Sequence, residues 1–152
     1  LLGLSDQSYQ GCNQQSWCRE LLGHNGEIQN RLLMPGPVGN MADWYERADL
    51  FLLPSRYEGF PNVLLEAMAA GCPCIASDCC TGPADLISDG QNGRLLPADA
   101  STQRWVEEID ALLKNPSQGR RLAESAVSVR DRFSEARLRS DFLGALEGLL
   151  HG

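Results

Sequence analysis

The stretch DLFLLPSRYEGFPNVLLE, residues 49–66, reads as a strand, a loop and a helix in direct succession. Its apolar run Leu50–Leu53 lies between Asp49 and Pro54, which is typical of a strand buried on both faces of a parallel sheet. A helix then begins near Pro61, because proline is favoured at the first helical position, and ends at Gly71, which tolerates a positive φ. The stretch therefore predicts a strand–loop–helix unit.

Two carboxylates in this unit, Glu58 in the loop and Glu66 in the helix, indicate a ligand rich in hydroxyl groups. Asn62 and Glu66 share one helical face, and helical side chains lean toward the N-terminus, so Glu66 is directed back toward the loop. The amides near Asn62, Val63 and Leu64 lie at the positive end of the helix dipole and predict an anion site. This order of groups matches a sugar attached to a nucleoside diphosphate. Taken alone, the two residues are better explained as solvated carboxylates, which are common.

Strands and helices alternate along the rest of the chain. This alternation predicts an α/β fold, a Rossmann-like three-layer domain with a parallel sheet of about four to five strands and C-terminal helices. We expect a single domain over residues 1–152, in which Val63, Ala67 and Ala70 pack on the sheet and the C-terminal helices bury their apolar stripes. The expected strands cover residues 1–4, 31–34, 50–53, 74–77 and 94–96. The expected helices cover residues 7–22, 41–48, 61–70, 84–88, 105–113, 122–129 and 134–149.

Composition limits the classes of function. The chain has 152 residues, of which 43% are hydrophobic and 22% charged, as in an ordinary soluble domain. Its net charge of −7 argues against a nucleic-acid partner. No stretch approaches the roughly 18 apolar residues of a membrane span, and no signal peptide is visible.

Four of the six cysteines lie close together, at Cys72, Cys74, Cys79 and Cys80. A zinc site is disfavoured, because the first pair has C-x-C spacing and no histidine lies near. We therefore expect no metal and free thiols, which favour a reducing, cytoplasmic location.

The segment PSRYEGFPNVLLEAMAAG, residues 54–71, resembles the signature of the retaining glycosyltransferases of family 4, group 1, which have the GT-B fold. The resemblance continues through Pro73–Asp78, Gly82-Pro83 and Asn92–Leu96, and extends upstream to Pro35-Gly36. It covers residues 31 to 147, and the ordered set of motifs is far more specific than two glutamates alone.

The resemblance implies a role for each residue of the motif. Glu58, as the catalytic residue, would contact the hydroxyl groups of the donor sugar. The helix amides at Asn62–Leu64 would bind the diphosphate, and Glu66 would bind the ribose. A hexose or amino sugar would pass from a UDP- or GDP-sugar to a glycan or lipid-linked acceptor, in polysaccharide biosynthesis and without a metal cofactor. The residues that would line the sugar are Gly59, Phe60 and Pro61.

The resemblance also implies that the chain is partial. The family's donor domain opens with a strand and a helix that precede Leu1–Leu4, and the stretch after that strand carries an Arg and a Lys that hold the diphosphate. The N-terminal acceptor domain would be missing too, so we expect no sugar transfer by this chain alone, with Arg56 as the nearest substitute cation. Leu1–Leu4 would then pair with Leu50–Leu53, or a homodimer would form through an exposed sheet edge.

Two alternatives belong to other classes of function. A non-catalytic module, which binds a nucleotide or serves as an interaction domain left from a truncated glycosyltransferase, would contain the same residues. A dinucleotide-binding domain is disfavoured, because no G-x-G-x-x-G follows the first expected strand. Between the two donors, the likeness of the Asp78–Pro83 loop to that of some amino-sugar transferases favours UDP.

Overall fold

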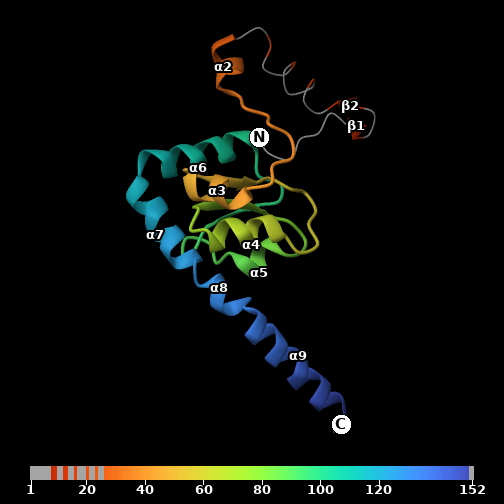
Figure 1. Cartoon of the computed structure of the whole chain (residues 1–152). Coiled ribbons are helices and arrows are strands. Elements are labelled where there is room, and N and C mark those ends of the chain that lie inside the picture. Colours follow the sequence, from red (N-terminus) through yellow and green to blue (C-terminus); the bar gives the residue numbers. More distant parts are fainter. Residues whose placement is uncertain are drawn as a thin grey trace. The chain divides into compact units, whose positions relative to one another are not determined.

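The computed structural model describes residues 26–150 and, nearer the N-terminus, residues 8, 9, 12, 13, 16, 20 and 23. The chain divides into two compact units, residues 1–41 and 42–152 (Figure 1). The strand expected at residues 1–4, and with it the expected pairing to residues 50–53, lies outside the described residues.

The described part of the first unit contains two short strands and a helix. Strand β1 (Ser8–Tyr9) pairs antiparallel with β2 (Cys12–Asn13), and helix α2 covers Gly26–Arg31. The helix expected over residues 7–22 is therefore wrong at residues 8, 9, 12 and 13, while residues 16 and 20 are helical as expected. The strand expected at residues 31–34 is also wrong, because Arg31 ends α2 and the following residues pair with no described strand. Such short apolar runs do not define their own structure.

The second unit is built on three parallel strands. These are β3 (Phe51–Leu53), β4 (Cys74–Asp78) and β5 (Arg94–Pro97), in the spatial order β3-β4-β5. Leu52 lies opposite Ile75, which lies opposite Arg94 on the other side. The predicted parallel sheet is confirmed, with three strands in the described part of the chain instead of four to five.

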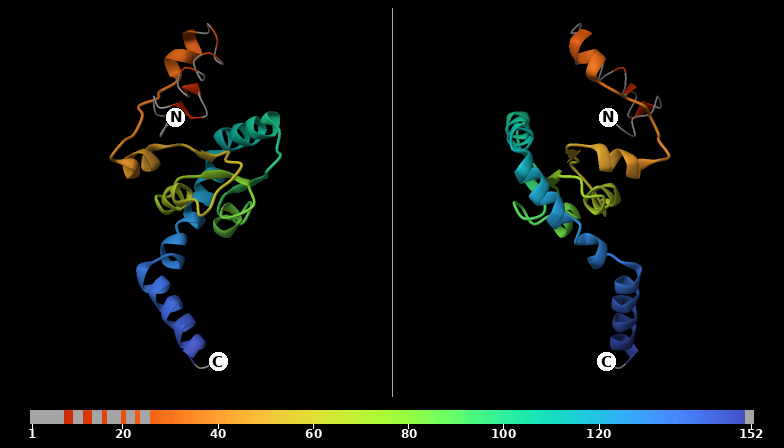
Figure 2. Two further views of the ribbon diagram at one scale, coloured as in Figure 1. Left: turned by 90° about the vertical axis from the view of Figure 1, so that its right-hand side faces the viewer. Right: turned by 60° about the vertical axis from the view of Figure 1, so that its left-hand side comes forward.

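Helices cover both faces of this sheet. Helices α4 and α5 lie on one face and α6 lies on the other, so the predicted three layers are present, and α7 runs past the end of the sheet and contacts both α6 and α4 (Figures 1 and 2). Helix α4 begins immediately after Pro61 and is followed by Gly71 with φ 76°, as the sequence predicts. The helices are α3 (Met41–Arg47), α4 (Asn62–Ala69), α5 (Pro83–Leu86), α6 (Thr102–Lys114), α7 (Pro116–Ala126), α8 (Val129–Arg132) and α9 (Glu135–Leu150).

Apolar side chains pack on both sides of the central strand β4. On the α6 side, Ile75, Leu96, Leu112 and Leu122 form one buried cluster. On the α4 side, the buried residues are Leu64, Ala67 and Met68, whereas Val63 is 42% exposed and Ala70 is only half-buried. The expected packing of Ala67 is therefore confirmed, whereas Val63 is exposed and its neighbour Leu64 packs in its place.

A buried ion pair connects β5 to α6. Arg94 donates through Nε to Oε1 of Glu108 at 2.6 Å and through a terminal nitrogen to Oε2 at 3.3 Å. Arg104, one helical turn earlier on α6, approaches Oε2 of Glu108 at 3.0 Å. Glu108 is 6% exposed, and its charge is compensated by both guanidinium groups.

The last helix, α9, differs from the other long helices. Ser134 caps it as predicted, because its hydroxyl oxygen accepts a hydrogen bond from the Arg137 amide at 3.3 Å. Its apolar stripe was expected to be a core face, yet Leu138, Phe142 and Leu149 are 51%, 64% and 80% exposed. That expectation is wrong in this structure, since no described segment packs over the stripe.

Candidate functional site

Two loops meet at the carboxyl edge of the sheet and hold Glu58. The loop after β3 carries Glu58, and the Thr81 hydroxyl, in the loop after β4, donates a hydrogen bond to the Glu58 carbonyl oxygen. Gly82 has φ 94°, and a Cβ added to it would lie 2.5 Å from Cδ of Pro61 and 2.8 Å from the carbonyl oxygen of Gly59. Only glycine allows this approach, so the two loops are in direct contact.

The residues expected to line the sugar differ in their exposure. Glu58 is half-buried, whereas Gly59 is exposed and Pro61 is buried. Phe60 is 45% exposed, and its ring centroid lies 5.6 Å from that of Phe133. This aromatic contact packs Phe60 against protein on one side and leaves the neighbouring Gly59 exposed.

The start of α4 offers fewer free amides than the sequence suggests. The Asn62 amide donates to the Phe60 carbonyl at 2.9 Å, and the Leu64 amide donates to the Pro61 carbonyl at 3.0 Å. The Val63 amide has no backbone bond of this kind in the described part of the chain. Leu64 is fully buried, so its side chain serves packing, while Asn62 and Val63 are exposed.

Glu66 is exposed on α4 and has a partner that the sequence did not reveal. The Tyr45 hydroxyl on α3 donates a hydrogen bond to Oε2 of Glu66 at 3.4 Å. Tyr45 is 3% exposed, and burial, followed by the Glu66 charge and this hydrogen bond, raises the pKa of Tyr45 to about 12. Tyr45 therefore stays protonated at neutral pH and orients one oxygen of Glu66, leaving the other accessible. The two residues are 21 positions apart, and no local sequence pattern signals their contact.

A cavity of about 620 Å³ lies at the same edge of the sheet, and we name it the carboxyl-edge cavity. It is bounded by the segments that follow β3 and β5, by the end of β4 and by the first turn of α6. Its polar and aromatic lining consists of Arg56, Ser77, Asp99, Thr102 and Trp105. Arg56 is exposed and stands two residues before Glu58, so this cavity borders the loop that carries the candidate catalytic carboxylate.

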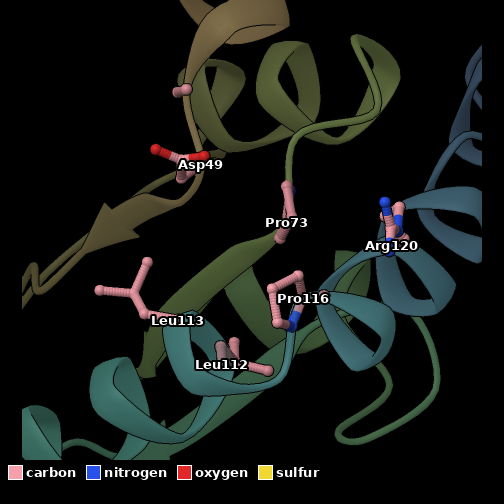
Figure 3. Close-up of a pocket in the computed structure, with 8 residues that line it drawn as sticks. Asp49, Pro73, Leu112, Leu113, Pro116 and Arg120 are labelled. Carbon is pink, nitrogen blue, oxygen red and sulfur yellow. The ribbon is translucent and has the colours of Figure 1, made fainter.

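A second cavity, of about 270 Å³, lies at the opposite end of the sheet. Figure 3 shows that Asp49 and Pro73 line it just before β3 and β4, and that Leu112, Leu113, Pro116 and Arg120 reach it from α6 and α7. Ligands of open α/β sheets bind at the carboxyl ends of the strands. This cavity is therefore remote from the candidate site.

The thiols of the second unit are free, and three of the four are buried. Cys72, Cys74 and Cys79 are buried and Cys80 is exposed. Burial, followed by the charge of Asp49, raises the pKa of Cys72 to about 11, so its thiol is unreactive at neutral pH. Among the described residues, no group of three or more His, Cys, Asp or Glu side chains could hold a metal ion. The helices described contain none that is both long and apolar enough to cross a bilayer.

Comparison with known proteins agrees with this architecture. The profile of the family described as Glycosyl transferases group 1 matches residues 9–115, and the chain belongs to this family. It is 37% identical over 122 residues to an exopolysaccharide phosphotransferase of Streptomyces coelicolor, a match that covers 80% of this chain and 13% of that protein. It is 32% identical over 125 residues to the D-inositol 3-phosphate glycosyltransferase of Streptosporangium roseum, covering 80% of this chain and 28% of that protein.

A solved structure shows the same fold. The structure of Anabaena HepE in complex with UDP superposes with a TM-score of 0.77 and 22% identity, over 89% of this chain and 38% of that one. The predicted family, its GT-B type of fold and glycosyl transfer as the family's reaction are thus confirmed. The chain spans less than a third of the length of the two curated relatives.

Proposed function

We propose that residues 42–152 form the donor-binding part of a retaining glycosyltransferase that uses a nucleotide-sugar. One observation carries the proposal: Glu58 and Glu66 stand on a loop and a helix that follow the same strand, β3, at the carboxyl edge of a parallel sheet. Gly82 and Tyr45 fix that loop and that helix side chain from two other elements. Ligand-binding groups held by rigid elements are typical of a preorganised site.

In this proposal each group meets one part of the donor. Glu58 binds hydroxyl groups of the sugar, and the backbone of residues 59–61 lines it. The Val63 amide and the positive end of α4 stabilise the diphosphate, which gains negative charge as the glycosidic bond breaks. Glu66, oriented by Tyr45, accepts hydrogen bonds from the ribose hydroxyls. No metal ion takes part. The exposed Arg56, two residues before Glu58, is the cation that would partly replace the missing Arg and Lys at the diphosphate.

The donor class and the setting are part of the same proposal. The UDP bound to Anabaena HepE and the sequence of the Asp78–Pro83 loop support a UDP-linked hexose or amino sugar. The acceptor is a glycan or a lipid-linked sugar in cytoplasmic polysaccharide biosynthesis, consistent with the free thiols. The groups that position its reacting hydroxyl belong to another part of the enzyme, so the 152-residue chain alone transfers no sugar. A turnover assay of the purified chain, with a panel of donors and acceptors, checks this point.

The outer edge of β3 is a candidate surface for association between two chains. On its other side from β4, β3 pairs with no strand in the described part of the chain, and Leu52 is 40% exposed. Open apolar edges favour association, so we propose that isolated chains form a homodimer through this edge. Sedimentation measurements that find only monomers would contradict it.

Titration calorimetry with UDP and GDP tests the donor site. Glu66→Ala removes a hydrogen bond to a charged group, which is worth about 1.5–3 kcal/mol, so UDP affinity should fall roughly 10- to 100-fold. Glu124→Ala, at an exposed position on α7 away from the site, is the matched control and should bind like the wild type. Equal UDP affinity of Glu66→Ala and the wild type would remove Glu66 from the ribose role.

A further inference from the structure

We propose that the carboxyl-edge cavity binds a neutral saccharide unit, one sugar of the acceptor glycan. The inference rests on the proposed function, because it assigns a substrate class to the cavity beside the donor loop. The cavity's volume of about 620 Å³ lies within the ordinary range for small-molecule sites.

Ser77 is the observation that points most directly to a ligand. It lies at the end of β4, is 4% exposed and lines the cavity. Its hydroxyl has no hydrogen-bond partner among the described residues, although buried hydroxyls are normally paired. In that part of the chain, no fully enclosed side-chain oxygen or nitrogen lacks a partner, so the Ser77 hydroxyl must be reachable from the cavity. A ligand oxygen there would complete its bonding.

The rest of the lining offers what a sugar requires. Arg56 supplies donors, Asp99 supplies acceptors, and the Thr102 hydroxyl supplies both. In the described structure, none of these three side chains is engaged in an ion pair or a side-chain hydrogen bond. Trp105 is half-buried and adds an aromatic wall, on which the apolar face of a pyranose ring can pack.

Charge and polarity argue against other ligands. Arg56 is the one cation in the described lining, and Asp99 is the one anion, so the wall carries no net charge to attract a free phosphate. A purely apolar ligand would leave the Ser77 hydroxyl and both charges without partners, which is costly. A neutral molecule with many hydroxyl groups satisfies all of them.

Nuclear magnetic resonance of the whole 152-residue chain tests the inference. The chain is labelled with ¹⁵N and titrated separately with methyl β-D-glucopyranoside, methyl β-D-galactopyranoside, inorganic phosphate and UDP. The indole N–H signal of Trp105 is identified by its loss in Trp105→Phe. We expect at least one glycoside to shift this signal saturably, with a Kd on the order of 1 mM.

Two outcomes would overturn the inference, and a third would contradict only the proposed donor site. If neither glycoside shifts the Trp105 signal at concentrations tenfold above that Kd, the inference is overturned. If phosphate shifts it and the glycosides do not, the cavity is an anion site and the inference is overturned as well. Failure of UDP to bind would contradict the proposed donor site alone, while a glycoside response would still support saccharide binding here.

Two variants sharpen the test. Ser77→Ala should weaken glycoside binding roughly three- to tenfold, because one hydrogen bond is lost, with unchanged UDP affinity. Its melting temperature should not fall, since the hydroxyl has no protein partner. Val106→Ala, at an exposed position beside Trp105 but outside the lining, is the control and should bind the glycoside normally. A Ser77→Ala chain that unfolds, or that binds the glycoside as well as wild type, contradicts the role given to Ser77.

Discussion

Helices α6 and α9 carry apolar residues at the same spacing, yet the stripe of α6 packs against the core and the stripe of α9 is exposed to solvent. On α6, Leu112 is 4% exposed, and Trp105 and Ile109 pack against the cluster around Ile75. On α9, every described side chain is exposed. Amphipathic periodicity therefore identifies a face that needs covering, but it does not identify what covers that face.

The charged residues of the two helices differ in the same way. On α6, Glu108 lies buried between Arg94 and Arg104. On α9, Arg137 and Asp141 form a pair at 3.3 Å whose side chains are 66% and 59% exposed. A buried carboxylate depends on its partners, whereas an exposed pair contributes little because water screens it.

The largest difference between the helices should appear when a leucine is truncated on each. Leu112→Ala leaves a cavity in the core and should lower the free energy of unfolding by about 2–5 kcal/mol. Leu138→Ala makes the same change on α9 and should cost less than about 0.5 kcal/mol, because that side chain is 51% exposed. Urea denaturation of both variants measures the two values, and equal losses would contradict the difference in burial between the two helices.

A smaller difference is expected for the charged pairs. Glu108→Gln removes the charge that compensates two arginines and should destabilise the protein by about 2–3 kcal/mol, given that Arg94 is partly exposed. Asp141→Asn is the counterpart on α9 and should stay within about 0.5 kcal/mol of the wild type. Chemical denaturation at low and at high salt measures the free energy of unfolding of both variants. A Glu108→Gln variant as stable as Asp141→Asn would show that the buried charge is dispensable.

The smallest effect concerns tyrosine and appears only at high pH. Folding raises the pKa of Tyr45 from 10.0 to about 12, so its contribution to stability is complete below pH 10 and is lost as the pH rises toward 12. Unfolding free energies measured from pH 8 to 11.5 should fall less steeply for Tyr45→Phe than for the wild type. Tyr57→Phe, at an 83% exposed position, should follow the wild-type curve, and Cys72 affects all three proteins alike. Parallel curves for all three would contradict the burial argument for Tyr45.

The sequence predicted the fold best where local signals are strong. Pro61 before α4, Gly71 after it and Ser134 at the cap of α9 each act through the backbone of their own segment. The errors fell on residues 8, 9, 12 and 13, where strand pairing overrides the helical pattern, and on residues 31–34, where a short apolar run does not specify a partner strand. The expectation for α9 failed for a similar reason, because the sequence of a helix does not specify which surface packs against its apolar stripe.

The candidate site could be predicted only in part. The loop that bears Glu58 and the helix that bears Glu66 were both anticipated, and their ligand roles stay predictions. Tyr45 beside Glu66 was missed, because contacts between distant segments arise from packing and not from spacing. Ser77 was missed for a related reason: within a buried strand, a serine has no pattern that distinguishes an open hydroxyl from a satisfied one.

Gly82 has a consequence for anyone who wishes to exchange the Glu58 loop of this protein. Since the backbone there rests directly on Gly59 and Pro61, the shape of each loop depends on that of the other. If only residues 58–61 were replaced by those of another protein, the new loop would not fit against residues 78–83. A successful chimera should therefore exchange residues 54–61 and 78–83 together, because the two loops pack against each other.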